Sequence, residues 1–156
     1  MDKYQIAFIS GTLAGILLDA LDAASLVIQR AFGLRHILYL DYLAAMLLHG
    51  QPAQGVFEVV CAQFFHLMFT GAIGCVYIAL LTLLKDKNSV FKGWLIAGVG
   101  IWFSAFMTGV LYRISLFVQA EMNSVLSDFI TASIFGIALA LIYEHLTRRY
   151  RARGES

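Results

Sequence analysis

Charged residues, proline and cysteine are all scarce in this sequence. Charged residues make up 13% of it and apolar residues 60%, whereas soluble domains contain about 25% charged and about 45–50% apolar residues. The composition therefore excludes an ordinary soluble domain and predicts an integral membrane protein. Because a single proline leaves little room for linkers, we expect residues 1–156 to form one membrane domain.

The sequence also lacks the marks of several function classes. Four of its eleven basic residues lie in the last nine positions, and no broad basic surface is predicted, so no nucleic-acid partner is expected. It contains no G-x-S-x-G, Walker, H-E-x-x-H or C-x-x-C motif. We therefore expect neither an enzyme nor a cofactor or metal site.

Four long apolar stretches fill most of the chain. A membrane-spanning helix needs about 20 mostly apolar residues, and this length is reached by residues 4–32, 56–84, 91–118 and 124–146. Gly33 is expected to end the first helix. We therefore predict an all-α fold, a bundle of four transmembrane helices.

A shorter apolar segment, residues 36–49, lies between the first two spans. Segments of this length are too short to cross a bilayer and are more often interfacial or re-entrant. Tyr39 and Tyr42 suit the headgroup level of a membrane. We predict a short helix here that lies along one membrane face or dips into it.

Basic residues are divided unequally between the two ends of the predicted bundle. With four spans, both termini lie on one side. That side carries eight of the eleven basic residues: Lys3, Lys85, Lys87, Lys92, Arg148, Arg149, Arg151 and Arg153. The other side carries Arg30, Arg35 and Arg113. The positive-inside rule then predicts a multi-pass protein of the cell membrane with cytoplasmic termini, and with the short helix on the outer face.

Two carboxylates, Asp19 and Asp22, interrupt the first span one helical turn apart. Charged groups at such a depth usually face the bundle interior and have a partner. Glu58, Asp128 and Arg113 are expected at a comparable depth on the other helices. We predict an ion pair between Arg113 and Asp22 or Asp19, with at least one neighbouring acid protonated. This polar cluster either fixes the helix packing or forms a proton or cation path.

A polar stripe of Gln63, His66 and Thr70 runs along the second span at steps of three and four residues. This spacing places the three side chains on one helix face. We expect His66, near the middle of the span, to hydrogen-bond to another helix. A metal ligand or a proton relay is the alternative role for it.

Small residues form a further pattern in the apolar stretches. Gly11-x-x-x-Gly15 in the first span is the clearest case, and Gly71, Gly74 and Gly136 lie in the second and fourth spans. Small residues let membrane helices approach each other closely. We expect these glycines to pack helices within the chain, with a homo-oligomer interface as the alternative.

Several short motifs together resemble a loose group of small four-helix bacterial integral membrane proteins. They are Gly11, Ala14 and Gly15 ahead of Asp19; Leu40-Asp41-Tyr42-Leu43-Ala44; His66 followed by Gly71 and Gly74; and Lys92-Gly93 with Trp102. The resemblance covers most of the chain. It implies the four-span topology and no particular activity.

Three function classes fit these patterns. The first is a structural or assembly protein that associates with itself or with a larger membrane complex, surrounded by membrane lipids. The second is an oligomeric subunit of a proton, cation or small-solute transporter or channel that uses the intramembrane carboxylates. The third is a lipid- or quinone-binding subunit with an aromatic groove around Trp94, Trp102, Phe103 and Phe106.

Overall fold

The computed structural model describes residues 2–33, 39–48, 55–83, 89–113 and 122–154. Every regular element in these ranges is helical, which confirms the predicted all-α fold. Four helices are long and apolar enough to cross a membrane: α1 (Lys3–Ala31), α3 (Val56–Leu83), the continuous helix Ser89–Leu111, and α7 (Met122–Gly154). The described chain is therefore that of a multi-pass membrane protein.

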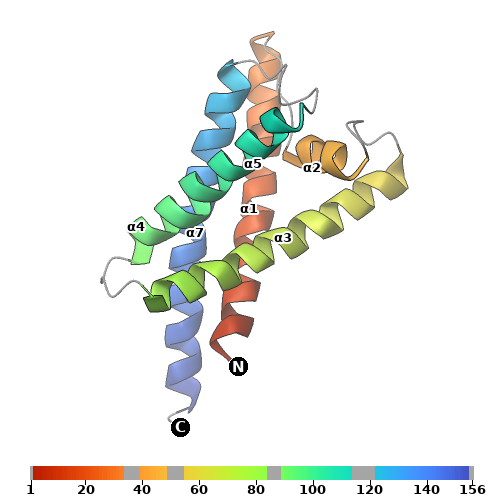
Figure 1. The fold of residues 1–156 in the computed structure, drawn as a ribbon. Helices are drawn as coiled ribbons and strands as arrows, with labels where there is room; N and C mark the ends of the chain where they lie inside the picture. The colour runs from red at the N-terminus through yellow and green to blue at the C-terminus, as the bar shows by residue number, and fades with distance from the viewer. Residues whose placement is uncertain (1, 34–38, 49–54, 84–88, 114–121, 155–156) are drawn as a thin grey trace.

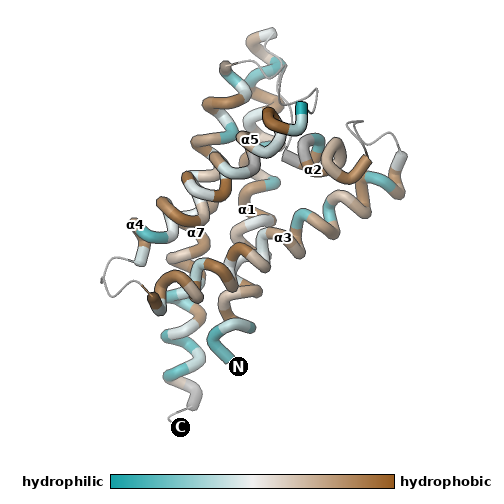
Figure 2. Tube along the Cα trace, viewed as in Figure 1, coloured by the Kyte–Doolittle hydropathy of each residue, from teal (hydrophilic) through white to brown (hydrophobic). Residues whose placement is uncertain are grey.

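The N-terminus and the C-terminus lie at the same end of the molecule (Figure 1). We call this end the terminal end and the opposite one the far end. Helices α1 and α7 pack side by side, and α3 crosses α1 obliquely. Figure 2 shows hydrophobic residues along the long helices, with hydrophilic ones at the start of α1 and along the C-terminal part of α7.

The short helix predicted between the first two spans is α2 (Tyr39–Leu47). It packs against α3 and runs across the bundle instead of along it (Figure 1). The predicted positions 36–38 and 49 lie outside the described residues, as do the side chains of Tyr39 and Tyr42. Ala44 and Ala45 are fully or almost fully buried, so α2 belongs to the packed structure.

Two predicted helix ends need correction. The third helix ends at Leu111, not near residue 118, because Arg113 takes a positive φ of 53° that an α-helix cannot continue through. Residues 114–118 lie outside the described chain. The fourth helix continues past Leu146 to Gly154. The pair Glu144–Arg148, 3.7 Å apart at i and i+4, supports this extension.

The third spanning helix also contains a π-helical segment that the sequence patterns did not predict. It consists of α4 (Ser89–Gly93), the π-helix η1 (Trp94–Gly100) and α5 (Ile101–Leu111). At Gly98 of η1 an added Cβ would lie 2.9 Å from the backbone oxygen of Ala132. The π-helical turn therefore coincides with close packing of this helix against α7.

Helices α1 and α3 approach each other closely at glycines. A Cβ at Gly11 would overlap the backbone oxygen of Thr70, and a Cβ at Gly74 would overlap that of Ala7. A Cβ at Gly15 would lie 2.9 Å from the Cβ of Thr70. Glycine at these positions lets the two backbones touch.

The remaining packing glycines also lie at contacts within the chain. Gly71 faces the ring of Phe8, where an added Cβ would lie 2.6 Å from the nearest ring carbon. Gly136 of α7 faces Gly93 of α4, and a Cβ at Gly93 would lie 2.8 Å from the Cβ of Ala140. All five glycines that the sequence singled out for packing are thus engaged inside this chain.

Two helix ends use the left-handed backbone region, and they allow a matched test. Gly33 follows α1 with φ 71°, as expected for the residue that ends this helix, and Arg113 follows α5 with φ 53°.

Arg113→Gly should raise the free energy of unfolding by about 1 kcal/mol, because an L side chain is strained there. Gly33→Ala, with nothing within 4 Å of the added Cβ, should lower it by about as much. Unfolding in mixed micelles measures both, and an unchanged Arg113→Gly would contradict the assignment.

Candidate functional site

A histidine and a carboxylate meet between α3 and α1. Nε2 of His66 lies 3.0 Å from Oδ1 of Asp19, an ion pair when the imidazole is protonated. Nε2 of Gln63 donates to Oδ2 of the same carboxylate at 2.6 Å. The His66 side chain is 4% exposed and that of Asp19 26%. The first two members of the predicted polar stripe therefore converge on Asp19.

Thr70, the third member of the stripe, has a packing role. Its hydroxyl donates to the backbone oxygen of Leu67 at 3.1 Å, within its own helix. Its side chain fills the space above Gly15 of α1. Within the stripe, Thr70 therefore packs against α1, whereas His66 and Gln63 make polar contacts with it.

The register of the antiparallel helices α1 and α3 explains why Asp19 meets His66. Gly11 and Gly74 face each other at the crossing, where a Cβ at Gly74 would lie 3.3 Å from the backbone nitrogen of Gly11. Asp19 follows Gly11 by eight residues, and His66 precedes Gly74 by eight. Both lie about two helical turns from the crossing. This equal spacing is the signal in the sequence from which the contact could have been predicted.

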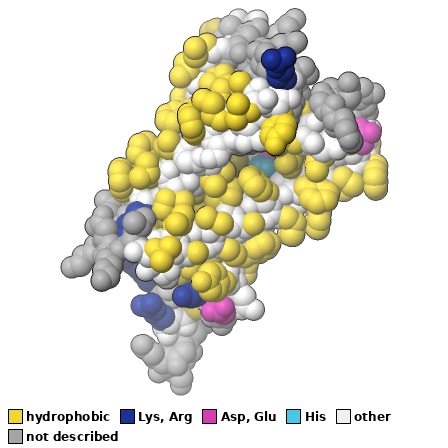
Figure 3. All heavy atoms as spheres, in the orientation of Figure 1, with side chains coloured by type: hydrophobic (Ala, Val, Ile, Leu, Met, Phe, Trp, Pro, Cys, Tyr) yellow, Lys and Arg dark blue, Asp and Glu magenta, His cyan; other side chains and the backbone are white. Residues whose placement is uncertain are grey.

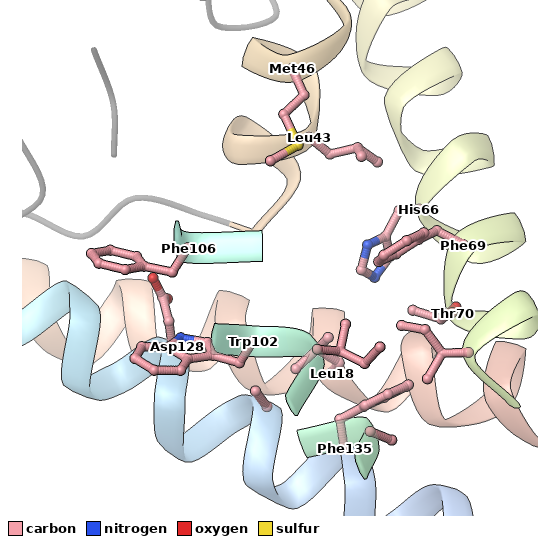
Figure 4. A pocket seen from close by; sticks show the side chains of 14 residues that line it. Leu18, Leu43, Met46, His66, Phe69, Thr70, Trp102, Phe106, Asp128 and Phe135 are labelled. Carbon is pink, nitrogen blue, oxygen red and sulfur yellow. The ribbon is translucent and has the colours of Figure 1, made fainter. Parts of the chain in front are cut away.

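A cavity of ≈ 140 Å³ lies beside His66. Its walls come from α1, α2, α3, α7 and the helix η1–α5, and they are mainly apolar. Figure 3 shows the corresponding hollow between α5 and α3, with a histidine inside it. Helix α2 covers one side of it through Leu43 and Met46 (Figure 4).

The cavity has two ionisable residues in its described lining, His66 and Asp128, and no lysine or arginine. Figure 4 shows them on opposite sides, His66 next to Phe69 of α3 and Asp128 next to Trp102 and Phe106. Asp128 is 4% exposed. The Trp102 and Phe106 rings are stacked, with centroids 5.6 Å apart and an interplanar angle of 9°. Aromatic and ionisable groups therefore line the same cavity.

The predicted aromatic groove is only partly present. Trp102 and Phe106 line the cavity, but Trp94 and Phe103 are not among its lining residues. The Trp94 ring instead lies against Phe91, with centroids 5.7 Å apart. Phe103 is 51% exposed. The π-helical segment and α5 therefore direct only part of this aromatic sequence inward.

Asp22 and Asp128 are both buried, on α1 and α7. Towards the far end these two helices share polar contacts that the sequence interpretation missed. Ser25 and Ser127 hydroxyls are 2.8 Å apart. Nδ2 of Asn123 donates to Oε1 of Gln29 at 3.1 Å. The available signal was the i, i+4 spacing of Ser25 with Gln29 on one helix and of Asn123 with Ser127 on the other.

The predicted ion pair of Arg113 with Asp22 or Asp19 is not among the ion pairs of the described residues, and Asp19 contacts His66 and Gln63 instead. Arg113 is exposed at the end of α5, and the ion pairs of the described residues do not include it. Arg113 lies away from Asp19 because α5 ends at Leu111, which places Arg113 in the turn that follows this helix.

Glu58 is also separate from Asp19. It lies in the first turn of α3, where its Oε2 accepts a hydrogen bond from the backbone nitrogen of Gly55 at 3.3 Å. This end of α3 diverges from α1 and α7 (Figure 1). The predicted cluster of five charged residues is therefore divided: Asp19 joins His66, Asp128 lines the cavity, and Glu58 caps a helix.

Neither metal binding nor a disulfide has support in the described part of the chain. It contains no group of three or more His, Cys, Asp or Glu side chains that could hold a metal ion. Cys61 and Cys75 are free thiols. In comparisons with known proteins, no family model matches the chain, and no curated protein or solved structure matches it significantly.

Proposed function

We propose that the protein binds an amphipathic molecule of the bilayer, whose polar end occupies the cavity beside His66. One observation carries this proposal: an apolar cavity of ≈ 140 Å³ inside a membrane-spanning bundle has two ionisable residues, His66 and Asp128, in its described lining. An apolar pocket with a few convergent polar groups is the usual form of a small-molecule site. A cavity of about 150 Å³ can hold benzene, so a compact headgroup fits by size.

The surroundings of the cavity suit a ligand that keeps its tail in the lipid. Phe69 and Met46 line the cavity and are 49% and 39% exposed, so they connect it to the outer surface of the bundle. Large exposed apolar side chains cover much of the same face in Figure 3. An alkyl chain leaving the cavity would therefore meet apolar surface.

We place this protein in the cell membrane with both termini in the cytoplasm. Among the described residues, five basic ones lie near the terminal end: Lys3, Arg148, Arg149, Arg151 and Arg153. Lys92 lies in α4, and Arg30 and Arg113 lie near the far end. Lys85, Lys87 and Arg35 lie outside the described residues. The positive-inside rule supports this orientation. With it, the short helix α2 lies towards the outer half of the bilayer.

The two other function classes have weaker support. Self-association through small residues would compete with contacts that the five packing glycines already make inside the chain. A proton or cation path would need polar groups along the whole span. The polar contacts between α1 and α7 lie towards the far end, whereas α1 and α3 are closely packed at glycines nearer the terminal end. The cavity therefore favours binding over assembly or conduction.

Filling the cavity tests the proposal directly. Ala132 is 4% exposed and lines the cavity, so the larger side chain of Ala132→Leu should occupy the space of the ligand. Wild-type protein purified in mild detergent should retain an amphipathic molecule, and Ala132→Leu should retain at least about tenfold less, equivalent to about 1.4 kcal/mol of binding free energy. Native mass spectrometry measures the bound fraction.

The control is Ala72→Leu, the same substitution at an exposed position of α3. It should retain the molecule as the wild type does, and unfolding curves should show all three proteins folded. If the wild type retains nothing and a native lipid extract does not raise its unfolding temperature, the proposal is wrong.

A further inference from the structure

We infer that the polar end of the ligand is a single planar ring, as in a phenol or a quinone, and that this ring carries the alkyl tail. The inference rests on the proposed binding function and names the class of headgroup that the cavity selects. Two properties of the cavity support it: the aromatic rings in its described lining, and its size.

The cavity is lined by aromatic rings from three helices. They belong to Phe69 of α3, to Trp102 and Phe106 of α5, and to Phe135 of α7. The imidazole of His66 adds a further planar ring. Aromatic rings attract one another in offset-stacked or edge-to-face contacts, and this attraction adds to the burial of apolar area. A planar ring in the cavity therefore gains more than a saturated group of the same size, which gains from burial alone.

These rings lie on opposite sides of the cavity. In Figure 4, Phe69 lies next to His66 on one side, and Trp102 and Phe106 lie on the other. The Trp102 and Phe106 rings are nearly parallel, at 9°, and Phe129 meets Trp102 edge-on with a centroid distance of 5.3 Å. Two neighbouring rings thus fix the orientation of the indole, and a planar group in the cavity has aromatic rings on both sides of it.

The size of the cavity limits the headgroup to one ring. A space of ≈ 140 Å³ is close to the volume of about 150 Å³ that holds benzene, so a phenol or benzoquinone ring fits. A fused ring system such as a sterol does not. Met46 and Phe69 are partly exposed and line the path of the tail to the surface. The thioether of Met46 also suits contact with the edge of an aromatic ring.

The test compares planar rings with a saturated ring on the same alkyl chain. The full-length protein in a neutral detergent is titrated with a para-alkylphenol, the matching para-alkylcyclohexanol and an alkylbenzoquinone, while tryptophan emission is recorded. The phenol and the cyclohexanol share their tail and hydroxyl group and differ only in the ring. The chain has two tryptophans, so Trp94→Phe leaves only Trp102, which lines the cavity. Trp102→Phe leaves only Trp94 and serves as the control for unspecific partition.

At least one of the two planar compounds should change the emission of Trp102 saturably. Its affinity should be at least about threefold above that of the cyclohexanol, because only the planar ring makes aromatic contacts. The planar compound that binds more tightly identifies the ring as a phenol or a quinone. The emission of Trp94 in the control variant should follow partition into the micelle for all three compounds.

A matched pair of substitutions on α3 tests the contribution of one ring. Phe65 and Phe69 lie about one turn apart and are each 49% exposed, but of the two only Phe69 is among the described lining residues. Phe69→Leu keeps an apolar side chain and removes the ring. It should lower the affinity for the planar compound at least about threefold and change that for the cyclohexanol by less than about twofold. Phe65→Leu should change neither affinity by more than about twofold.

The outcomes separate this inference from the proposed function. If the cyclohexanol binds as tightly as both planar compounds, or if Phe69→Leu weakens the planar compound and the cyclohexanol equally, the inference is overturned and the binding function stands. If none of the three binds saturably, the inference is also overturned, and retention of a native molecule by the purified wild type decides separately on the binding function. The comparison of compounds uses an intact lining, so it decides even if Phe69→Leu does not fold.

Discussion

Gly74→Ala is expected to lower the free energy of unfolding by about 3 kcal/mol, the upper part of the range for overpacking. The added Cβ would overlap the backbone oxygen of Ala7 and lie 2.9 Å from its carbonyl carbon. A backbone atom cannot rotate away as a flexible side chain can, so α1 and α3 would have to separate. Separation would open the contacts along the whole crossing, because protein interiors tolerate few voids.

Gly11→Ala should have a similar effect, since its Cβ would overlap the backbone oxygen of Thr70 across the same crossing. One separation of the helices relieves both overlaps. The double variant should therefore lose clearly less stability than the sum of the two single losses, by at least about 1 kcal/mol. Strict additivity would contradict a shared crossing.

Reversible unfolding in mixed micelles, followed by circular dichroism, measures these free energies. Gly55→Ala is the matched control, because nothing lies within 4 Å of its added Cβ. It should be close to neutral. If Gly74→Ala unfolds like this control, the close approach of α1 and α3 does not exist in the folded protein.

The spanning helices could be predicted from the sequence because bilayer thickness dictates the length of an apolar run. The first span was expected over 4–32 and is Lys3–Ala31; the second was expected over 56–84 and is Val56–Leu83. Hydropathy does not predict the end of a helix where the backbone conformation, and not the end of the apolar run, terminates it. The third helix stops at Leu111 because of the backbone conformation at Arg113, although apolar residues continue beyond it.

The site residues could be found individually, but their pairing could not be derived from depth alone. Asp19, His66 and Gln63 were each identified as polar residues in apolar helices. Arg113 was expected beside Asp19 because both were counted to the same depth. Which groups meet depends on the rotation and register of the helices, and these follow from where the glycines let the backbones touch.

The cavity itself was beyond prediction from one sequence. It depends on how α3 diverges from α5 and on how α2 packs between them, which are tertiary relations (Figure 1). Leu43 and Met46 of α2 carry no pattern that distinguishes a cavity wall from a core. The π-helical turn at Trp94–Gly100, which places Ala97 in the cavity wall, has no clear sequence signal either.

Asp19→Leu is expected to lower the free energy of unfolding by about 3 kcal/mol. It removes the carboxylate from a polar contact between helices and leaves the polar groups of the other helix in place. His66 and Gln63 would lose their carboxylate partner, and polar groups without partners are costly in apolar surroundings. Reversible unfolding in mixed micelles gives this value. Asp22→Leu is not a suitable control, since Asp22 is buried and its removal has a cost of its own. Glu58→Leu, at the exposed end of α3, should cost less than about 1 kcal/mol.

The double variant Asp19→Leu with His66→Phe should recover most of the loss, to within about 1 kcal/mol of the wild type. Replacing both members of a polar pair between helices by apolar groups is often neutral, because the cost of desolvating the two groups disappears together with their attraction. Gln63 can then turn towards the surface, as it is only partly buried. A double variant as unstable as Asp19→Leu would instead assign the pair to helix packing.

The same double variant separates stability from function. His66 lines the cavity, so a folded protein without the pair should still lose at least about tenfold in retention of the bound amphipathic molecule. If the double variant is stable, packing alone does not explain the polar pair. Under the proposed function, Asp19 holds the imidazole of His66 in place beside the ligand. Unchanged retention in the folded double variant would restrict binding to the Asp128 side of the cavity.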